Sequence, residues 1–153
     1  MTLLKGKPVF GGLASGPAMM TKIPMNFTAS FTKPKNIFPW SRSQIQDRHH
    51  DLFKRNVKGC VLIFPAAIGS TYTGMVLLEL MYQGCAPAAI VVQNIDPLLV
   101  SGPVLADIWF SKGIPVVEYS GEDIYDKISD DDWVEVNGET GEIQIRKQIS
   151  SSD

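Results

Sequence analysis

The chain has 153 residues, with 44% hydrophobic and 20% charged residues and a formal net charge of −2 at pH 7. A chain of this size forms a single domain that buries a core without disulfides or a structural metal. The slight acidity and the lack of a basic stripe exclude an ordinary nucleic-acid-binding surface. The apolar runs are too short to span a bilayer, and the start, MTLLKGKPVF, lacks the apolar segment of a secretory signal.

The two cysteines, Cys60 and Cys85, both lie in apolar surroundings. This pattern favours buried free thiols in a reducing cytosol. Two cysteines are also too few for the ligands of an iron–sulfur cluster or a structural zinc. We therefore expect a cytoplasmic protein that binds no metal by itself, with one domain over residues 1–147 and a polar tail over 148–153.

The first part of the chain predicts short strands followed by a long loop. Residues 7–10 and 18–22 favour strands joined by a glycine-rich turn. Residues 23–43 contain several prolines and aromatic residues but few periodic apolar positions. We expect an ordered loop there, and long loops of this kind in compact domains are often functional.

The next segment, IQDRHHDLF, places Arg48, His49 and His50 between Asp47 and Asp51. It is either a solvated polar turn or a loop that faces an anion or a substrate. Arg48 could hold a substrate carboxylate through its two-pronged guanidinium group. Adjacent histidines point in different directions on a regular element, so the sequence disfavours a metal site shared by both rings.

The middle of the chain predicts alternating strands and helices. The expected elements are a buried strand over 57–64, a helix over 73–84, a strand over 87–93, a helix over 101–113 and a strand over 114–119. In the second helix, Ser101 is the expected cap and Pro103 fits the first turn. This alternation predicts parallel strands connected by helical crossovers.

The segment WVEVNGETGEIQI alternates apolar and polar residues on both sides of Asn137-Gly138. Val134 and Val136 share one face of the first arm, and Ile143 and Ile145 share one face of the second. The pattern predicts a β-hairpin that closes an α/β domain.

The stretch FPAAIGSTYTG, residues 64–74, connects the first predicted central strand to the helix after it. Ser70 or Thr71 could simply cap that helix, which is worth roughly 1 kcal/mol. Alternatively, a hydroxyl here takes part in chemistry. Ionising it at neutral pH costs on the order of 8 kcal/mol. A helix N-terminus offsets at most about 2 kcal/mol, so such a base would work only where a partner contributes cations or a metal.

Two resemblances follow from these motifs. KGIPVVEY followed by WVEVNGETGEIQI resembles the swivelling phosphohistidine domains of phosphoenolpyruvate-using enzymes, which are three-layer β/β/α modules. The position that matches the phosphorylated histidine of that family is Val104, which cannot accept a phosphoryl group. This resemblance therefore implies the fold and not the phosphocarrier activity.

The second resemblance covers most of the chain. KGKPVFGGLASGPAMM, DRHHDL, the Gly-Ser-Thr turn, APAAI and GIPVV occur in this order, and the set resembles the small subunit of the aconitase X group of hydro-lyases. The resemblance implies a swivelling β/β/α domain that is active only with a large catalytic subunit, as a heterodimer or higher assembly. It also implies an iron or iron–sulfur centre on that large subunit and a small carboxylate substrate.

The same resemblance implies roles for individual residues. The catalytic serine of the family aligns with Thr71, and Ser70 is the neighbouring candidate. The turn commonly reads Gly-Ser-Ser-Thr-Gly-Ser in the family and reads Gly-Ser-Thr-Tyr-Thr-Gly here, which keeps a hydroxyl and adds a methyl group. The expected substrate-binding or interface residues are Gly69, Arg48, His49 and His50.

We expect the chain to supply a hydroxyl general base for the dehydration of cis-3-hydroxy-L-proline. The preference for this substrate rests on charge, because a phosphorylated substrate would favour more cations than Arg48 alone. The alternatives are the small subunit of a phosphomevalonate dehydratase and a non-catalytic binding module with the same fold.

Overall fold

Eight strands form one continuous sheet in the order β1-β8-β7-β3-β4-β5-β6-β2. The computed structural model describes residues 1–69 and 71–148. The strands are β1 (Thr2–Lys5), β2 (Lys7–Phe10), β3 (Leu13–Met20), β4 (Val61–Phe64), β5 (Ala89–Val92), β6 (Val116–Glu118), β7 (Trp133–Asn137) and β8 (Glu142–Arg146). The helices are α1 (Phe27–Phe31), α2 (Thr73–Tyr82), α3 (Pro97–Phe110) and α4 (Ile124–Lys127), with 3₁₀ turns η1 (Pro34–Ile37) and η2 (Pro39–Ser41).

Strand β3 belongs to both halves of this sheet. Residues 13–17 pair antiparallel with β7, and residues 18–20 pair parallel with β4. Near the change of partner, Gly16 lies so close to the Gly59 carbonyl that a Cβ would overlap it. A glycine is therefore required where the strand passes from one half of the sheet to the other.

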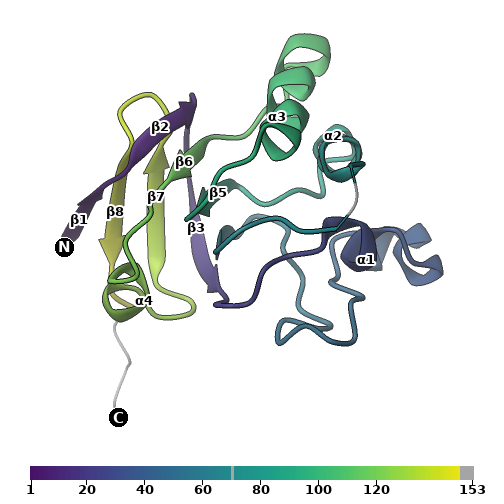
Figure 1. Cartoon of the computed structure of the whole chain (residues 1–153), viewed down its shortest axis with the longest axis horizontal. Coiled ribbons are helices and arrows are strands. Elements are labelled where there is room, and N and C mark those ends of the chain that lie inside the picture. Colours follow the sequence, from purple (N-terminus) through teal and green to yellow (C-terminus); the bar gives the residue numbers. More distant parts are fainter. Residues whose placement is uncertain (70, 149–153) are drawn as a thin grey trace.

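The two halves of the sheet and the helices form three layers (Figure 1). Strands β1, β8 and β7 form one outer layer, and α1, α2 and α3 form the other. Side chains buried between the two halves of the sheet include Leu4, Val61, Ile63, Val91, Val134, Val136, Ile143 and Ile145. Side chains buried between the central strands and the helices include Leu62, Phe64, Ile90, Val92, Leu77, Leu80, Leu99 and Ala106. The expected β/β/α architecture is confirmed.

The central strands are apolar throughout because both of their faces are covered. In β4, Val61 and Ile63 point into the cluster between the half-sheets, whereas Leu62 and Phe64 point toward the helices. Strands β4, β5 and β6 are parallel, so the predicted helical crossovers are also confirmed. None of the described helices is long and apolar enough to cross a bilayer.

The predicted start of the second helix at Ser101 is wrong. Helix α3 begins at Pro97, and the Asp96 carboxylate caps it by accepting the Leu98 N–H at 2.7 Å. The hydroxyl of Ser101 instead donates to the Leu98 carbonyl at 2.7 Å. The Asp-Pro pair is the stronger start signal, and Pro103 lies inside the helix rather than in its first turn.

Other predicted boundaries shift because local turns compete with the apolar pattern. The strand expected over 57–64 begins only at residue 61, since Val57 donates its N–H to the Ser43 carbonyl at 3.0 Å. The strand expected over 18–22 begins at residue 13. The expected loop over 23–43 contains α1, η1 and η2.

The predicted hairpin is confirmed as β7 and β8, and its four inward-facing Val and Ile side chains are buried. Strand β1, which the sequence did not predict, pairs antiparallel with β8. Residues 149–153 of the expected polar tail lie outside the described residues.

The buried Asp132 carboxylate binds the last described residues, Lys147 and Gln148. Asp132 accepts the Ser129 N–H at 2.8 Å, the Gln148 N–H at 3.0 Å and the Lys147 ammonium at 3.0 Å. Burial by itself raises the pKa of Asp132, but these hydrogen bonds outweigh it and hold the pKa below its usual value. The ionised carboxylate therefore stabilises the fold above the ordinary carboxyl pKa, and this stabilisation is lost as pH falls through the lower folded-state pKa.

Asp132→Asn is expected to lower the free energy of unfolding at pH 7 by about 1–3 kcal/mol, because a neutral amide accepts these donors poorly. The difference from the parent protein should narrow as the pH falls through the depressed pKa. Urea unfolding across the acid range measures both effects. Asp131→Asn is the matched control, because Asp131 is exposed and its positive φ of 70° suits asparagine. Equal losses in both variants would contradict the assigned role of Asp132.

Candidate functional site

The turn that follows β4 runs beside the segment that leads into α1. Met25 and Ala67 form a parallel bridge. The Met25 N–H donates to the Ala66 carbonyl and the Ile68 N–H donates to the Met25 carbonyl, both at 2.9 Å. These bonds fix the backbone immediately before the Gly-Ser-Thr stretch.

Gly69 adopts a positive φ of 97°, which disfavours other residues. A Cβ at this position would also lie 2.7 Å from the side-chain nitrogen of Asn26. The oxygen of the same Asn26 side chain accepts the Ala29 N–H at 2.9 Å and so caps α1. Gly69 therefore lets the turn lie directly against the capped start of α1.

Gly74 permits close contact between α2 and α3. A Cβ on Gly74 would overlap the Ser101 hydroxyl and lie 2.6 Å from the Leu98 carbonyl. A Cβ on Gly102 would lie 2.7 Å from the Gly74 carbonyl. The start of α2 thus packs backbone against backbone on α3, which gives the preceding turn a rigid support.

Thr71 is exposed and lies before Tyr72, which occupies the N-cap position of α2. The capping alternative is therefore wrong for Thr71. Ser70 lies outside the described residues. Large apolar or aromatic side chains around this turn are exposed, namely Ile68, Tyr72, Met75 and Leu98.

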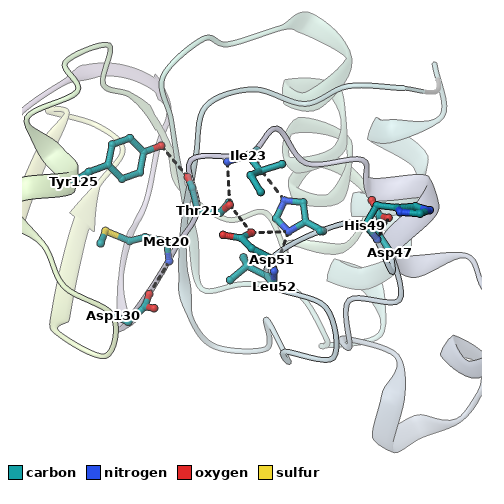
Figure 2. Close-up of polar contacts among 10 residues, drawn as sticks. Met20, Thr21, Ile23, Asp47, His49, Asp51, Leu52, Tyr125 and Asp130 are labelled. Atoms are coloured by element: carbon teal, nitrogen blue, oxygen red, sulfur yellow. Dashed lines mark hydrogen bonds and ion pairs between the residues drawn. The ribbon is translucent and has the colours of Figure 1, made fainter.

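His50 is buried, and its ring nitrogens have partners in Ile23 and Leu52, which Figure 2 labels. Nδ1 accepts the Leu52 N–H at 3.1 Å, so the neutral ring carries its proton on Nε2, which donates to the Ile23 carbonyl at 3.2 Å. A protonated ring would instead donate from Nδ1 to Asp51, 3.0 Å away. The Asp51 carboxylate also accepts the Thr21 hydroxyl at 2.7 Å. His50 thus connects the 47–52 loop to the end of β3, and its ring is not open to a substrate.

Arg48 and His49, in contrast, are exposed at a hollow of about 550 Å³. Figure 2 shows His49 pointing away from the Thr21–Asp51 contact. The hollow is also lined by Lys33 and Lys35, from the segment that was expected to form a loop. No sequence signal identified these lysines, because their proximity to Arg48 arises only when the chain folds.

The hollow and the turn are separate features that both lie beside α1. Ala29 lines the hollow, and Asn26, which caps Ala29, touches Gly69. No hydrogen bond or ion pair between described residues connects Thr71 to Arg48 or His49. The structure therefore gathers the predicted site residues into two neighbouring places and moves His50 to the interior.

The described residues do not fit a metal centre. Over residues 1–69 and 71–148, no group of three or more His, Cys, Asp or Glu side chains could hold an ion. The Cys60 thiol contacts the Asn56 and Lys58 carbonyls, and the Cys85 thiol contacts the Gln83 carbonyl. Burial raises the pKa of Cys60, partly offset by nearby Arg55, so this group favours the thiol over the metal-binding thiolate.

The two adjacent histidines provide a test of this assignment. His50→Ala is expected to lower the free energy of unfolding by about 1–3 kcal/mol, because the Leu52 amide and the Ile23 carbonyl lose their buried partner. His49→Ala should change it by less than about 0.5 kcal/mol, as for an ordinary exposed side chain. Denaturant unfolding of both variants measures the difference, and equal effects would contradict the separate roles.

Comparison with known proteins agrees with the fold and extends over nearly the whole chain. Residues 3–145 match the family described as the aconitase X swivel domain. The phosphomevalonate dehydratase small subunit of Methanocella arvoryzae is 34% identical over 142 residues, which cover 93% of this chain and 98% of that protein. The corresponding protein of Methanosarcina acetivorans is 30% identical over 148 residues, covering 97% and 94%.

A solved structure with a similar fold belongs to the same family. The holo form of aconitase X from Thermococcus kodakaraensis superposes with a TM-score of 0.80 at 25% identity, covering 96% of this chain and 100% of that one. The chain therefore belongs to the aconitase X family, as the swivel domain that forms the small subunit of its dehydratases.

Proposed function

We propose that this chain is the small subunit of a phosphomevalonate dehydratase and that it presents a hydroxyl base to a substrate held between two subunits. The observation that carries the proposal is the exposed Thr71 turn, held by α1 on one side and by the α2–α3 contact on the other. The choice of substrate is supported by the names of the relatives that align over almost their whole length.

The earlier preference for cis-3-hydroxy-L-proline rested on a shortage of cations near the site. Lys33 and Lys35 lie at the same hollow as Arg48 and His49, so the chain does not lack cations there. A phosphorylated substrate now agrees better with the charges of this chain.

The reaction removes a proton from a carbon next to a carboxylate and expels a hydroxyl from the neighbouring carbon. The base must therefore be available to a ligand, and Thr71 satisfies this requirement because it is exposed and does not cap α2. Its ionisation at neutral pH still costs on the order of 8 kcal/mol. The start of α2 offsets about 0.3–1 kcal/mol of this cost, so most of the stabilisation of the alkoxide must come from the partner.

That partner is the large subunit, which we propose also carries the iron or iron–sulfur centre and most of the substrate contacts. The exposed apolar side chains around the turn suit a protein interface better than open water. When the two subunits close, the turn loses water, which strengthens every electrostatic interaction at the hydroxyl.

The first expected result concerns activity. The chain alone should not dehydrate phosphomevalonate, and addition of the large subunit from the same organism should produce turnover that follows a 1:1 titration. The same mixture should act on cis-3-hydroxy-L-proline at least about a hundredfold more slowly. A preference for hydroxyproline would overturn the substrate assignment and leave the small-subunit assignment intact.

The second expected result concerns the base. Thr71→Ala and Thr71→Val should each lower kcat of the assembled enzyme by about 10²–10⁴-fold, the usual contribution of a general base. Thr71→Ser, which keeps the hydroxyl, should remain within about tenfold of the parent. Unfolding curves of the isolated chain should not change, because Thr71 is exposed, and a binding titration of the two subunits separates a loss of assembly from a loss of kcat.

Ser70→Ala and Thr140→Ala complete the experiment. Thr140→Ala removes an exposed hydroxyl in the β7–β8 turn and should leave kcat unchanged. Loss of activity in Ser70→Ala alone would transfer the role to Ser70. Full activity in both the Ser70 and the Thr71 variants would support a non-catalytic binding module instead.

A further inference from the structure

We propose that the hollow between α1–η1 and the 46–53 loop is a binding site for a phosphate monoester, and that it holds the phosphoryl end of the substrate. The identification of the ligand as substrate rests on the proposed function. The anion preference of the hollow rests on its own charges and on its walls.

The hollow gathers positive charge from two segments of the chain. Lys33 and Lys35 come from the segment after α1, and Arg48 comes from the loop after residue 46. The single acidic residue at its wall is Asp47, whose carboxylate accepts the His49 backbone N–H at 3.1 Å.

The cations of the hollow have no anionic partner within the described part of the chain. The ion pairs among the described residues involve His50, Lys127 and Lys147. None of them includes Lys33, Lys35 or Arg48. Three cations beside the single Asp47 carboxylate leave the hollow with a net positive charge, so an anion that enters relieves the repulsion between the cations as well as gaining attraction.

The chemistry of these groups matches a phosphate monoester. A phosphate monoester carries about −1.5 to −2 charges at pH 7 and offers three strong acceptor oxygens. The Arg48 guanidinium can take two of them in a fork, and the lysines act as point charges from other directions. Ala29, Pro34 and Phe53 form apolar parts of the wall, which lowers the local dielectric and strengthens the attraction.

The opposite side of the Thr21–Asp51 contact has the reverse charge. A second hollow there, of about 440 Å³, is lined by Lys22 but also by Asp51 and Asp130. Figure 2 shows Asp130 and Tyr125 on that side and Asp47 and His49 on the other. An anion therefore has a clear preference for one side of this edge of the sheet.

The position of the hollow suits a substrate that reacts at Thr71. The two places share the support of α1, since Ala29 lines the hollow and Asn26, whose side-chain oxygen accepts the Ala29 N–H, lies against Gly69.

The first experiment tests the anion site on the full chain without a partner. Inorganic phosphate is titrated at constant ionic strength while amide resonances are followed by NMR. Amides of residues 29–35 and 46–49 should shift together. The double variant Lys33→Gln/Lys35→Gln and the single variant Arg48→Gln should each weaken binding by about tenfold or more.

The matched control is Lys58→Gln/Arg55→Gln, which removes exposed cations outside the hollow. It should bind phosphate like the parent. Phosphate that leaves the two segments unshifted, or binds equally to the control and the hollow variants, would overturn the site.

The second experiment uses the assembled enzyme. Lys33→Gln/Lys35→Gln should raise KM for phosphomevalonate by about tenfold or more and change kcat by less than about threefold, because the lysines anchor a part of the substrate that does not react. An unchanged KM would overturn the assignment of the hollow to the substrate. An assembled enzyme without activity on phosphomevalonate would refute the proposed function, while the phosphate titration would still decide the anion site.

Discussion

The structure depends on one strand that serves two half-sheets. Strand β3 pairs with β7 through its first part and with β4 through its last part, and Gly16 permits the close passage near Gly59. Because of this change of partner, one half-sheet folds over the other and covers the inner face of the central strands. The outer face is covered by helices. The two segments that carry the candidate site begin at the ends of β3 and β4, and this arrangement of the sheet fixes the positions of both ends.

The two parts of the site have different mechanical support. The Thr71 turn lies between two contacts in which a glycine brings main chain close to its neighbour, at Gly69 against Asn26 and at Gly74 against α3. The cationic hollow is built from the 3₁₀ segment after α1 and from a loop tied inward by the buried His50. The Thr71 hydroxyl thus lies in a turn that is supported on both sides by regular elements, whereas the charges of the hollow belong to irregular segments and to long side chains.

Much of the fold could be predicted from the sequence because the strongest signals are local. The runs VLIF and AIVV indicated buried parallel strands, and the alternation around Asn137-Gly138 indicated the hairpin. The start of α3 was missed because Ser101 and Pro103 imitate a helix start, whereas Asp96 and Pro97 form the actual one. The gathering of Lys33 and Lys35 beside Arg48 could not be predicted, because no local pattern marks a contact that tertiary folding creates. The burial of His50 could not be predicted for the same reason. Its partners are the Ile23 carbonyl and the Leu52 N–H, and backbone groups leave no residue-type pattern in the sequence.

The division of the candidate site between two segments of the chain also has an evolutionary consequence. The proposed base belongs to residues 65–74, and the positive charges belong to residues 33–49. Mutations in the second segment can change which ligand is retained without disturbing the support of the hydroxyl. With the roles proposed above, a swivel domain built in this way can change its substrate through a few surface charges while its fold is retained.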